Sequence, residues 1–185
     1  TFGLYEKEFF TSKNVEILNH YPKGSLKLGI YLARAKKEND PIKKVNKVVC
    51  FVSQYRQGMF DSDSPPDKIF MNGSKILFEL TVLWALENNF SVLVSMSCER
   101  NEIYYDNELN FFKNINNSEI INFVSNDRVQ MLAYDNAMSS KLVIGMDSAL
   151  LLEMLGVGKK ILWGTSSVNT YLISSGMVKF KEKMP

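Results

Sequence analysis

The sequence predicts an α/β fold, a Rossmann-like three-layer sandwich around a central parallel sheet of about five strands. The first observation behind this prediction is that short apolar runs alternate with segments of helical periodicity from Lys47 onward. The second is that the first run, residues 47–53, has the continuous apolarity of a parallel strand that is buried on both faces. Right-handed crossovers between such strands would place helices on both faces of the sheet.

The predicted strands are the most apolar and β-branched stretches of the chain. They cover residues 47–53, 90–96, 119–124, 142–145 and 160–163. The predicted helices cover 74–88, 107–114, a segment after Asp127, 149–155 and 167–175. Asn89 is expected to end the first of these helices in the left-handed conformation. Residues 54–73 contain Pro65 and Pro66 and read as a long polar loop, either functional or a disordered insertion.

The first 40 residues differ in character from the rest. A turn at residues 21–24 precedes Ser25, which is a suitable cap for an apolar helix that follows it. We therefore expect residues 1–40 to be a linker or remnant of a preceding domain and residues 41–185 to form the α/β domain. The start without a methionine and the end on Lys-Met-Pro are interpreted as cuts in a longer protein.

Composition and charge exclude several classes of function. The 22 basic and 20 acidic residues are interspersed, so no basic stripe for nucleic acid is present. Cys50 and Cys98 are expected to be buried free thiols, and with a single histidine, His20, no zinc-ligand spacing exists. No metal is predicted, although a site made of carboxylates stays open. No apolar run approaches the ~20 residues that span a bilayer.

Small polar residues follow every predicted strand, and the carboxyl ends of parallel strands are where such sheets bind ligands. Three arginines come close behind the first three strands, and arginine matches phosphate oxygens. The residues that we expect to bind the substrate here are Ser53, Gln54, Arg56, Arg100, Arg128, Asp147 and Ser148. Among them, the arginines would neutralise phosphate charge, and the hydroxyls of Ser53 and Ser148 would be neutral donors to it. The alternative is that the serines and aspartates cap helices and the arginines lie on the surface.

Glu153 interrupts an otherwise apolar helix that begins after the Asp147–Ser148 turn. A carboxylate there is costly unless it is paired or faces a ligand, and it is suited to accept hydrogen bonds from two ribose hydroxyls. The alternative is an exposed helix glutamate. The chain has no GxGxxG after its first strand, no Walker A sequence and no nucleophile elbow, which argues against a standard NAD or FAD site and a serine–histidine triad.

The segment 142–162 resembles the nucleotide-sugar half of GT-B glycosyltransferases and the UDP-N-acetylglucosamine 2-epimerases of the same fold. The resemblance lies in Asp147–Ser148, in Glu153 and in Gly156-Val-Gly-Lys-Lys. The epimerase pattern is Asp-Ser-Gly-Gly-x-x-Glu, and this chain has Ala149–Leu150 in place of the two glycines. If the roles of these positions carry over from the resembled families, Ser148 and Ala149 would contact the phosphate and Glu153 would contact the ribose.

Residues 21–29, followed by Ser53–Gln–Tyr–Arg56, resemble bacterial surface-carbohydrate biosynthesis proteins. The two resemblances imply the donor-binding half of a glycosyltransferase for surface polysaccharide or glycolipid. They imply a nucleotide-sugar as donor substrate, no other cofactor, and no activity without an N-terminal acceptor domain. They also imply a cytoplasmic location, in which the full protein could associate peripherally with the inner face of the membrane. The alternatives are a sugar-nucleotide 2-epimerase and a non-catalytic α/β binding module.

Overall fold

The computed structural model describes residues 11–13, 25–38 and 47–164 of the chain, which divides into two units, residues 1–43 and 44–185. In the first unit, helix α2 spans Leu26–Glu38. The Leu28 N–H donates to Ser25 Oγ at 3.2 Å, so Ser25 caps this helix as predicted. The predicted turn at residues 21–24, His20 and the predicted helix over 167–175 lie outside the described residues.

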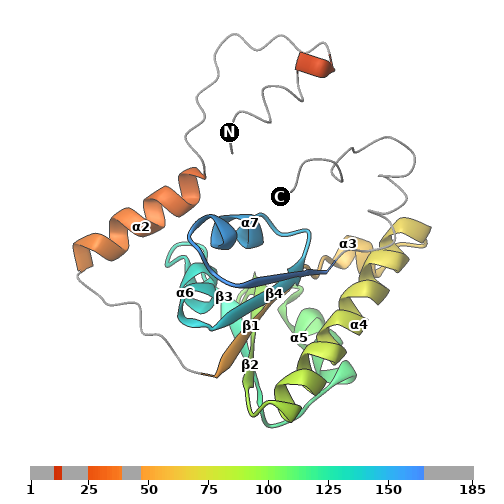
Figure 1. The fold of residues 1–185 in the computed structure, drawn as a ribbon. Coiled ribbons are helices and arrows are strands. Elements are labelled where there is room, and N and C mark those ends of the chain that lie inside the picture. The colour runs from red at the N-terminus through yellow and green to blue at the C-terminus, as the bar shows by residue number, and fades with distance from the viewer. Residues whose placement is uncertain (1–10, 14–24, 39–46, 165–185) are drawn as a thin grey trace. The chain divides into compact units, whose positions relative to one another are not determined.

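The second unit is built on a five-stranded sheet in the order β3-β2-β1-β4-β5, in which every neighbouring pair is parallel. The strands are β1 (Val48–Val52), β2 (Ser91–Glu99), β3 (Ile121–Asn126), β4 (Leu142–Met146) and β5 (Ile161–Gly164). The predicted α/β class and parallel sheet are therefore confirmed, and Figure 1 shows the sheet with helices around it.

Right-handed crossovers place the helices on both faces of this sheet. Helices α4 (Pro65–Glu87) and α5 (Tyr105–Ile115) follow β1 and β2 and contact each other and β2. Helices α6 (Leu132–Ser139) and α7 (Ala149–Gly156) follow β3 and β4 and pack together, α6 on β1 and β2 and α7 on β4 and β5 (Figure 1). The α4–α5 layer buries the largest aromatic cluster, since Phe51 of β1 lies 5.1 Å from Phe78 and 5.8 Å from Phe112 between ring centroids.

The prediction of a long loop over residues 54–73 was wrong. This stretch contains a short helix, α3 (Gln57–Phe60), and the first turns of α4, which begins at Pro65. Proline is tolerated in the first turn of a helix because the N–H groups there have no intrahelical partner, so Pro65 and Pro66 start the helix and do not break it. Asn89 follows α4 with φ of 56°, as predicted.

Helix α6 begins later than the sequence pattern suggests. Asp127 caps a separate turn that precedes the helix. Its carboxylate accepts the Gln130 N–H at 2.8 Å, and its carbonyl oxygen accepts the Leu132 N–H at 3.0 Å. Met131, with φ of 56°, then redirects the chain into the helix. The local hydrogen bonds of an aspartate therefore compete with the helix that its sequence predicts.

By its length and composition, helix α4 could cross a membrane. No such segment was expected from the sequence, because no single apolar run approaches the ~20 residues that span a bilayer. A single such helix is weak evidence, because the core helix of a globular domain meets the same criteria. Here Phe78, Val82 and Ala85 of α4 are fully buried, whereas Ile76 and Leu80 on its other side are exposed. The helix is therefore part of the core of this unit along one face.

Candidate functional site

The order of the strands places one topological switch point in this sheet, between β1 and β4. The chain leaves β1 toward β2 and leaves β4 in the opposite direction, toward β5. In open α/β sheets, ligands bind outside the carboxyl ends of the two strands where the direction reverses. The end of β1 leads into Ser53–Gln54 and the end of β4 into Asp147–Ser148, so four of the predicted site residues flank this point.

The two strands approach closely at this end because β4 carries a glycine. Gly145 pairs with Val52, and a Cβ at Gly145 would lie 3.1 Å from the Val52 carbonyl oxygen and 3.4 Å from Leu151 Cδ1 of α7. A larger residue would push β4 and α7 away from β1. Nothing in the sequence marks Gly145 as special, because only the pairing of the strands shows what it faces.

The turn between β4 and α7 is held in an uncommon conformation. Asp147 has φ of 28°, in the left-handed region that few residues other than glycine adopt. Ser148 follows as the N-cap of α7, is 7% exposed, and makes no side-chain capping hydrogen bond. The start of α7, with the N–H groups that have no partner within a helix, therefore lies directly at the end of β4. Backbone strain of this kind is concentrated at functional sites.

The most unusual group near this edge is one that the sequence analysis missed. Glu108 of α5 is 0% exposed, and four donor groups at the ends of β1 and β2 lie within hydrogen-bond distance of its carboxylate. Its Oε1 accepts from Ser53 Oγ at 2.5 Å and from the Ser97 N–H at 2.8 Å. It also lies 3.1 Å from Ser97 Oγ, whose single proton it shares with the Tyr55 carbonyl oxygen at 3.0 Å. Its Oε2 accepts from the Cys98 N–H at 2.9 Å. We call this set of Glu108, Ser53, Ser97 and Cys98 the Glu108 network.

The sequence contained a signal for the buried position of Glu108. It lies among Asp106, Asn107 and Asn110, which suggests a solvated helix face, but it is four residues before Phe112. Residues four apart share a helix face, and both Glu108 and Phe112 are fully buried. A carboxylate on the buried face of a helix has to find donors, and the ends of β1 and β2 supply them.

The Glu108 network gives Ser53 a structural role at the position where phosphate binding was predicted. The Ser53 hydroxyl donates to Glu108 and accepts the Tyr55 N–H at 3.1 Å, and the side chain is buried. Direct contact of this hydroxyl with phosphate stays a prediction. What the geometry shows is that Ser53 positions the backbone that leads into Gln54.

Both thiols have raised pKa values in this environment. Burial first, and then the Glu108 carboxylate, raise the pKa of Cys98 to about 12. Burial raises the pKa of Cys50 to about 12. Both cysteines are free, as predicted, but only Cys50 is buried, so the prediction of burial was wrong for the half-buried Cys98. Both are neutral thiols near pH 7, so neither serves as a ready nucleophile.

The three arginines differ in their partners. Arg128 pairs with Glu102 at 2.6 Å and with Glu99 at 3.5 Å, and its hydrogen bond to Glu102 lowers the pKa of that carboxyl. It also donates to the Ser97 carbonyl oxygen, at the ends of β2 and β3 and away from the switch point. Arg56 and Arg100 are exposed and make no ion pair within the described part of the chain.

Glu153 is not an exposed helix glutamate, so that alternative was wrong. It is 6% exposed, and its Oε2 accepts the Tyr134 hydroxyl at 2.7 Å. The hydrogen bond joins α7 to α6 and explains how an apolar helix accommodates a carboxylate. The contact of Glu153 with a ribose stays a prediction.

No group of three histidine, cysteine or acidic side chains suited to a metal ion is found among the residues that the structure describes. Comparison with protein families shows that residues 9–175 match the model of a family described as "putative O-antigen biosynthesis protein". Comparisons with curated proteins and with solved structures gave no match.

The Glu108 network predicts a large effect from a change of one atom. Glu108→Gln keeps the size of the side chain but turns an acceptor into an NH₂ group that faces the Cys98 N–H. A buried donor without a partner costs about 1–3 kcal/mol, so we expect the free energy of unfolding to fall by about that amount in urea denaturation. Glu119→Gln is the control, because Glu119 is exposed and lies shortly before β3. It should change the free energy of unfolding by less than about 0.5 kcal/mol. Equal effects of both variants would contradict this role of Glu108.

The raised pKa of Cys98 predicts slow alkylation. Iodoacetamide reacts with the thiolate, so the rate at Cys98, followed by peptide mass spectrometry, should keep rising beyond about pH 10, where an ordinary thiol is almost fully ionised. Glu108→Gln removes the negative charge, which should lower the pKa of Cys98 and increase the rate severalfold at pH 8. Asp106→Asn, on the same helix but exposed, should leave it unchanged. A rate that levels off near about pH 10 in the unmodified chain would show the assignment to be wrong.

Proposed function

This chain belongs to the O-antigen biosynthesis family whose model it matches, and on that premise we propose that its α/β unit binds the nucleotide part of a nucleotide-sugar donor. O-antigen is a surface polysaccharide, and its assembly requires activated sugars and enzymes that transfer them. A donor-binding unit of a glycosyltransferase fits this requirement. In the proposal, the donor is the substrate and the other half of the active site comes from an acceptor domain.

One observation carries the proposal: the start of α7 lies at the switch point, next to a strained turn and a close approach of two strands. The first N–H groups of a helix attract anions, and the helix dipole adds to this attraction. The diphosphate would lie at Ser148–Ala149, with Ser53–Gln54 across from it, directly after β1. Arg56 and Arg100 carry long cationic side chains that are not engaged in ion pairs among the described residues and would neutralise phosphate charge.

Glu153 would accept a hydroxyl of the ribose in this arrangement. It lies in the second turn of the same helix whose first turn would meet the phosphate. Its hydrogen bond with Tyr134 fixes the carboxylate before the ligand arrives, which reduces the ordering that binding requires. Asp147 would shape the turn. Arg128 is paired with both Glu99 and Glu102, so it would bind phosphate only by exchanging these partners.

A non-catalytic binding module is the alternative that a specific observation favours. Ser53, Arg128 and Glu153 each make hydrogen bonds or ion pairs within the chain. A sheet that kept its fold after loss of a ligand site would be expected to satisfy its polar groups in this way. The two readings differ in whether a nucleotide binds.

Ala149 provides a sharp test because it is exposed at the first position of α7. Ala149→Glu adds a negative charge, which stabilises a helix at its N-terminus, so the fold should be retained or stabilised. The same charge should repel a bound phosphate. Titration calorimetry with UDP, CDP, CMP and GDP should show saturable binding of at least one of them. We expect Ala149→Glu to weaken that binding by about tenfold or more.

Ala149→Gln is the matched control, since it has the same size without the charge, and it should bind nearly as the unmodified chain does. Absence of binding by all four nucleotides at millimolar concentration would overturn the proposal and favour the non-catalytic module. Equal affinities of the Glu and Gln variants would place any bound phosphate elsewhere.

A further inference from the structure

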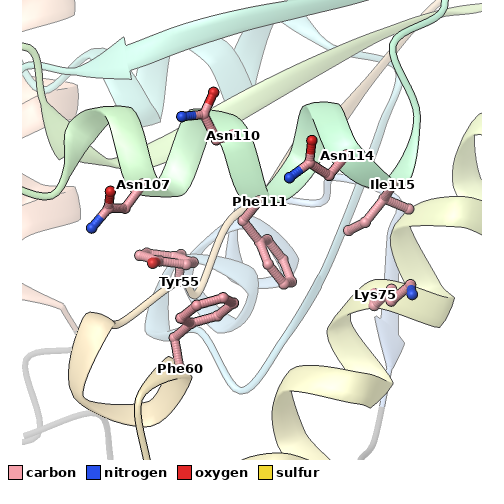
Figure 2. Close-up of a pocket in the computed structure, with 8 residues that line it drawn as sticks. All are labelled: Tyr55, Phe60, Lys75, Asn107, Asn110, Phe111, Asn114 and Ile115. Atoms are coloured by element: carbon pink, nitrogen blue, oxygen red, sulfur yellow. The ribbon is translucent and has the colours of Figure 1, made fainter.

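We propose that a second binding site, separate from the switch point, lies between α3, α4 and α5 and takes a sugar ring of a saccharide. A cavity of about 420 Å³ is lined there by Tyr55, Phe60 and Phe111, by Asn107 and Asn114, and by Lys75 (Figure 2). Pockets of about 300–1,000 Å³ are typical of sites for small molecules. The cavity shares no residue with the set proposed to hold the nucleotide.

Three aromatic rings form one wall of this cavity. The ring centroid of Tyr55 lies 5.8 Å from that of Phe60 and 5.5 Å from that of Phe111, and Phe60 and Phe111 lie 5.9 Å apart. Figure 2 shows Phe111 reaching from α5 to lie beside the rings of Tyr55 and Phe60, with Ile115 and Lys75 on its other side. Because each ring contacts the other two, the wall keeps its shape without a ligand. Phe60 is nevertheless 52% exposed, so apolar ring surface remains available.

Hydrogen bonds fix the position of Tyr55 and of one polar rim. Gln57 Oε1 accepts both the Tyr55 hydroxyl at 2.7 Å and the Asn107 Nδ2 group at 3.1 Å. The Gln57 amide in turn donates to Asp61. The Asn107 carbonyl oxygen therefore has a fixed direction, which is what recognition of a hydroxyl group requires.

The polar side chains of the cavity are mostly neutral. Asn107, Asn110 and Asn114 recur at helical spacing on α5, and Lys75 is the only charged residue in the lining. The Asn114 amide is exposed and forms no hydrogen bond within the described residues. Amides both donate and accept, which matches the hydroxyls of a sugar, and an aromatic wall matches the apolar C–H face of a sugar ring. With one cation, the cavity is unsuited to a diphosphate, whereas a neutral sugar or a uronic acid fits it.

Titration of the ¹⁵N-labelled full chain tests the proposal with defined probes: N-acetylglucosamine, galactose and glucuronic acid. Sorbitol is the control ligand, since it carries similar hydroxyls without a ring face. We expect saturable shifts of the Asn107 and Asn114 side-chain amide signals with at least one cyclic sugar, in the millimolar range, and none with sorbitol. No saturable shift with any cyclic sugar, or equal shifts with sorbitol, would overturn the proposal.

Two variants at exposed positions keep the fold intact and test the wall and the rim separately. Phe60→Ala removes ring surface and Asn114→Ala removes an amide, and each should weaken binding by about fivefold or more. Asn101→Ala, which is exposed and outside the cavity, should not change it. Equal affinity in all three variants would contradict the assignment. Binding of UDP to the same sample reports on the switch point alone, so the failure of one site is distinguishable from the failure of the other.

Discussion

The carboxyl edge of this sheet depends on a buried carboxylate. Glu108 brings a negative charge into a core that contains Phe51, Phe78 and Phe112, at a cost that is tolerable only because four donors converge on it. Two of these donors are backbone N–H groups of Ser97 and Cys98 and two are hydroxyls. One side chain of α5 thus joins the ends of β1 and β2 and sets the path that the chain takes from each strand.

The positions of the proposed ligand groups follow from that constraint. Since Ser53 is held by Glu108, the backbone after β1 has a defined direction at the switch point. On the other side, Gly145 allows β4 to approach β1, and the strained Asp147 turns the chain so that α7 begins at the same edge. The Glu108 network also anchors Tyr55, whose N–H donates to Ser53 Oγ and whose ring belongs to the aromatic cavity. Both proposed sites therefore rest on a common element of structure.

The fold could be predicted from the sequence because its signals are local. Each element carries the pattern of its own burial: a continuous apolar run in Val49–Val52, and apolar residues at helical spacing around Phe78. This pattern is visible in the sequence whichever elements lie next to it in the fold. The extent of α4 could not be read in this way, because proline marks a helix start and a loop equally well. Glu108 was missed because its partners lie 55 and 11 residues away in the chain, and only the pairing of β1 with β2 brings Ser53 and Ser97 together. The ion pairs of Arg128 could not be predicted for the same reason: Arg128 follows β3, whereas its partners Glu99 and Glu102 lie at the end of β2 and just after it.

Hydrogen–deuterium exchange of the full chain, resolved by residue and recorded with and without UDP, tests the account most directly. The Ser97 and Cys98 amides should exchange as slowly as the amides inside β1 and β2, although they lie near the end of a strand, because Glu108 accepts both hydrogen bonds. UDP should slow exchange at residues 147–150 and leave that of Ser97 and Cys98 unchanged. Rapid exchange of Ser97 and Cys98 in the free chain, or UDP-dependent protection that avoids residues 147–150, would contradict the account.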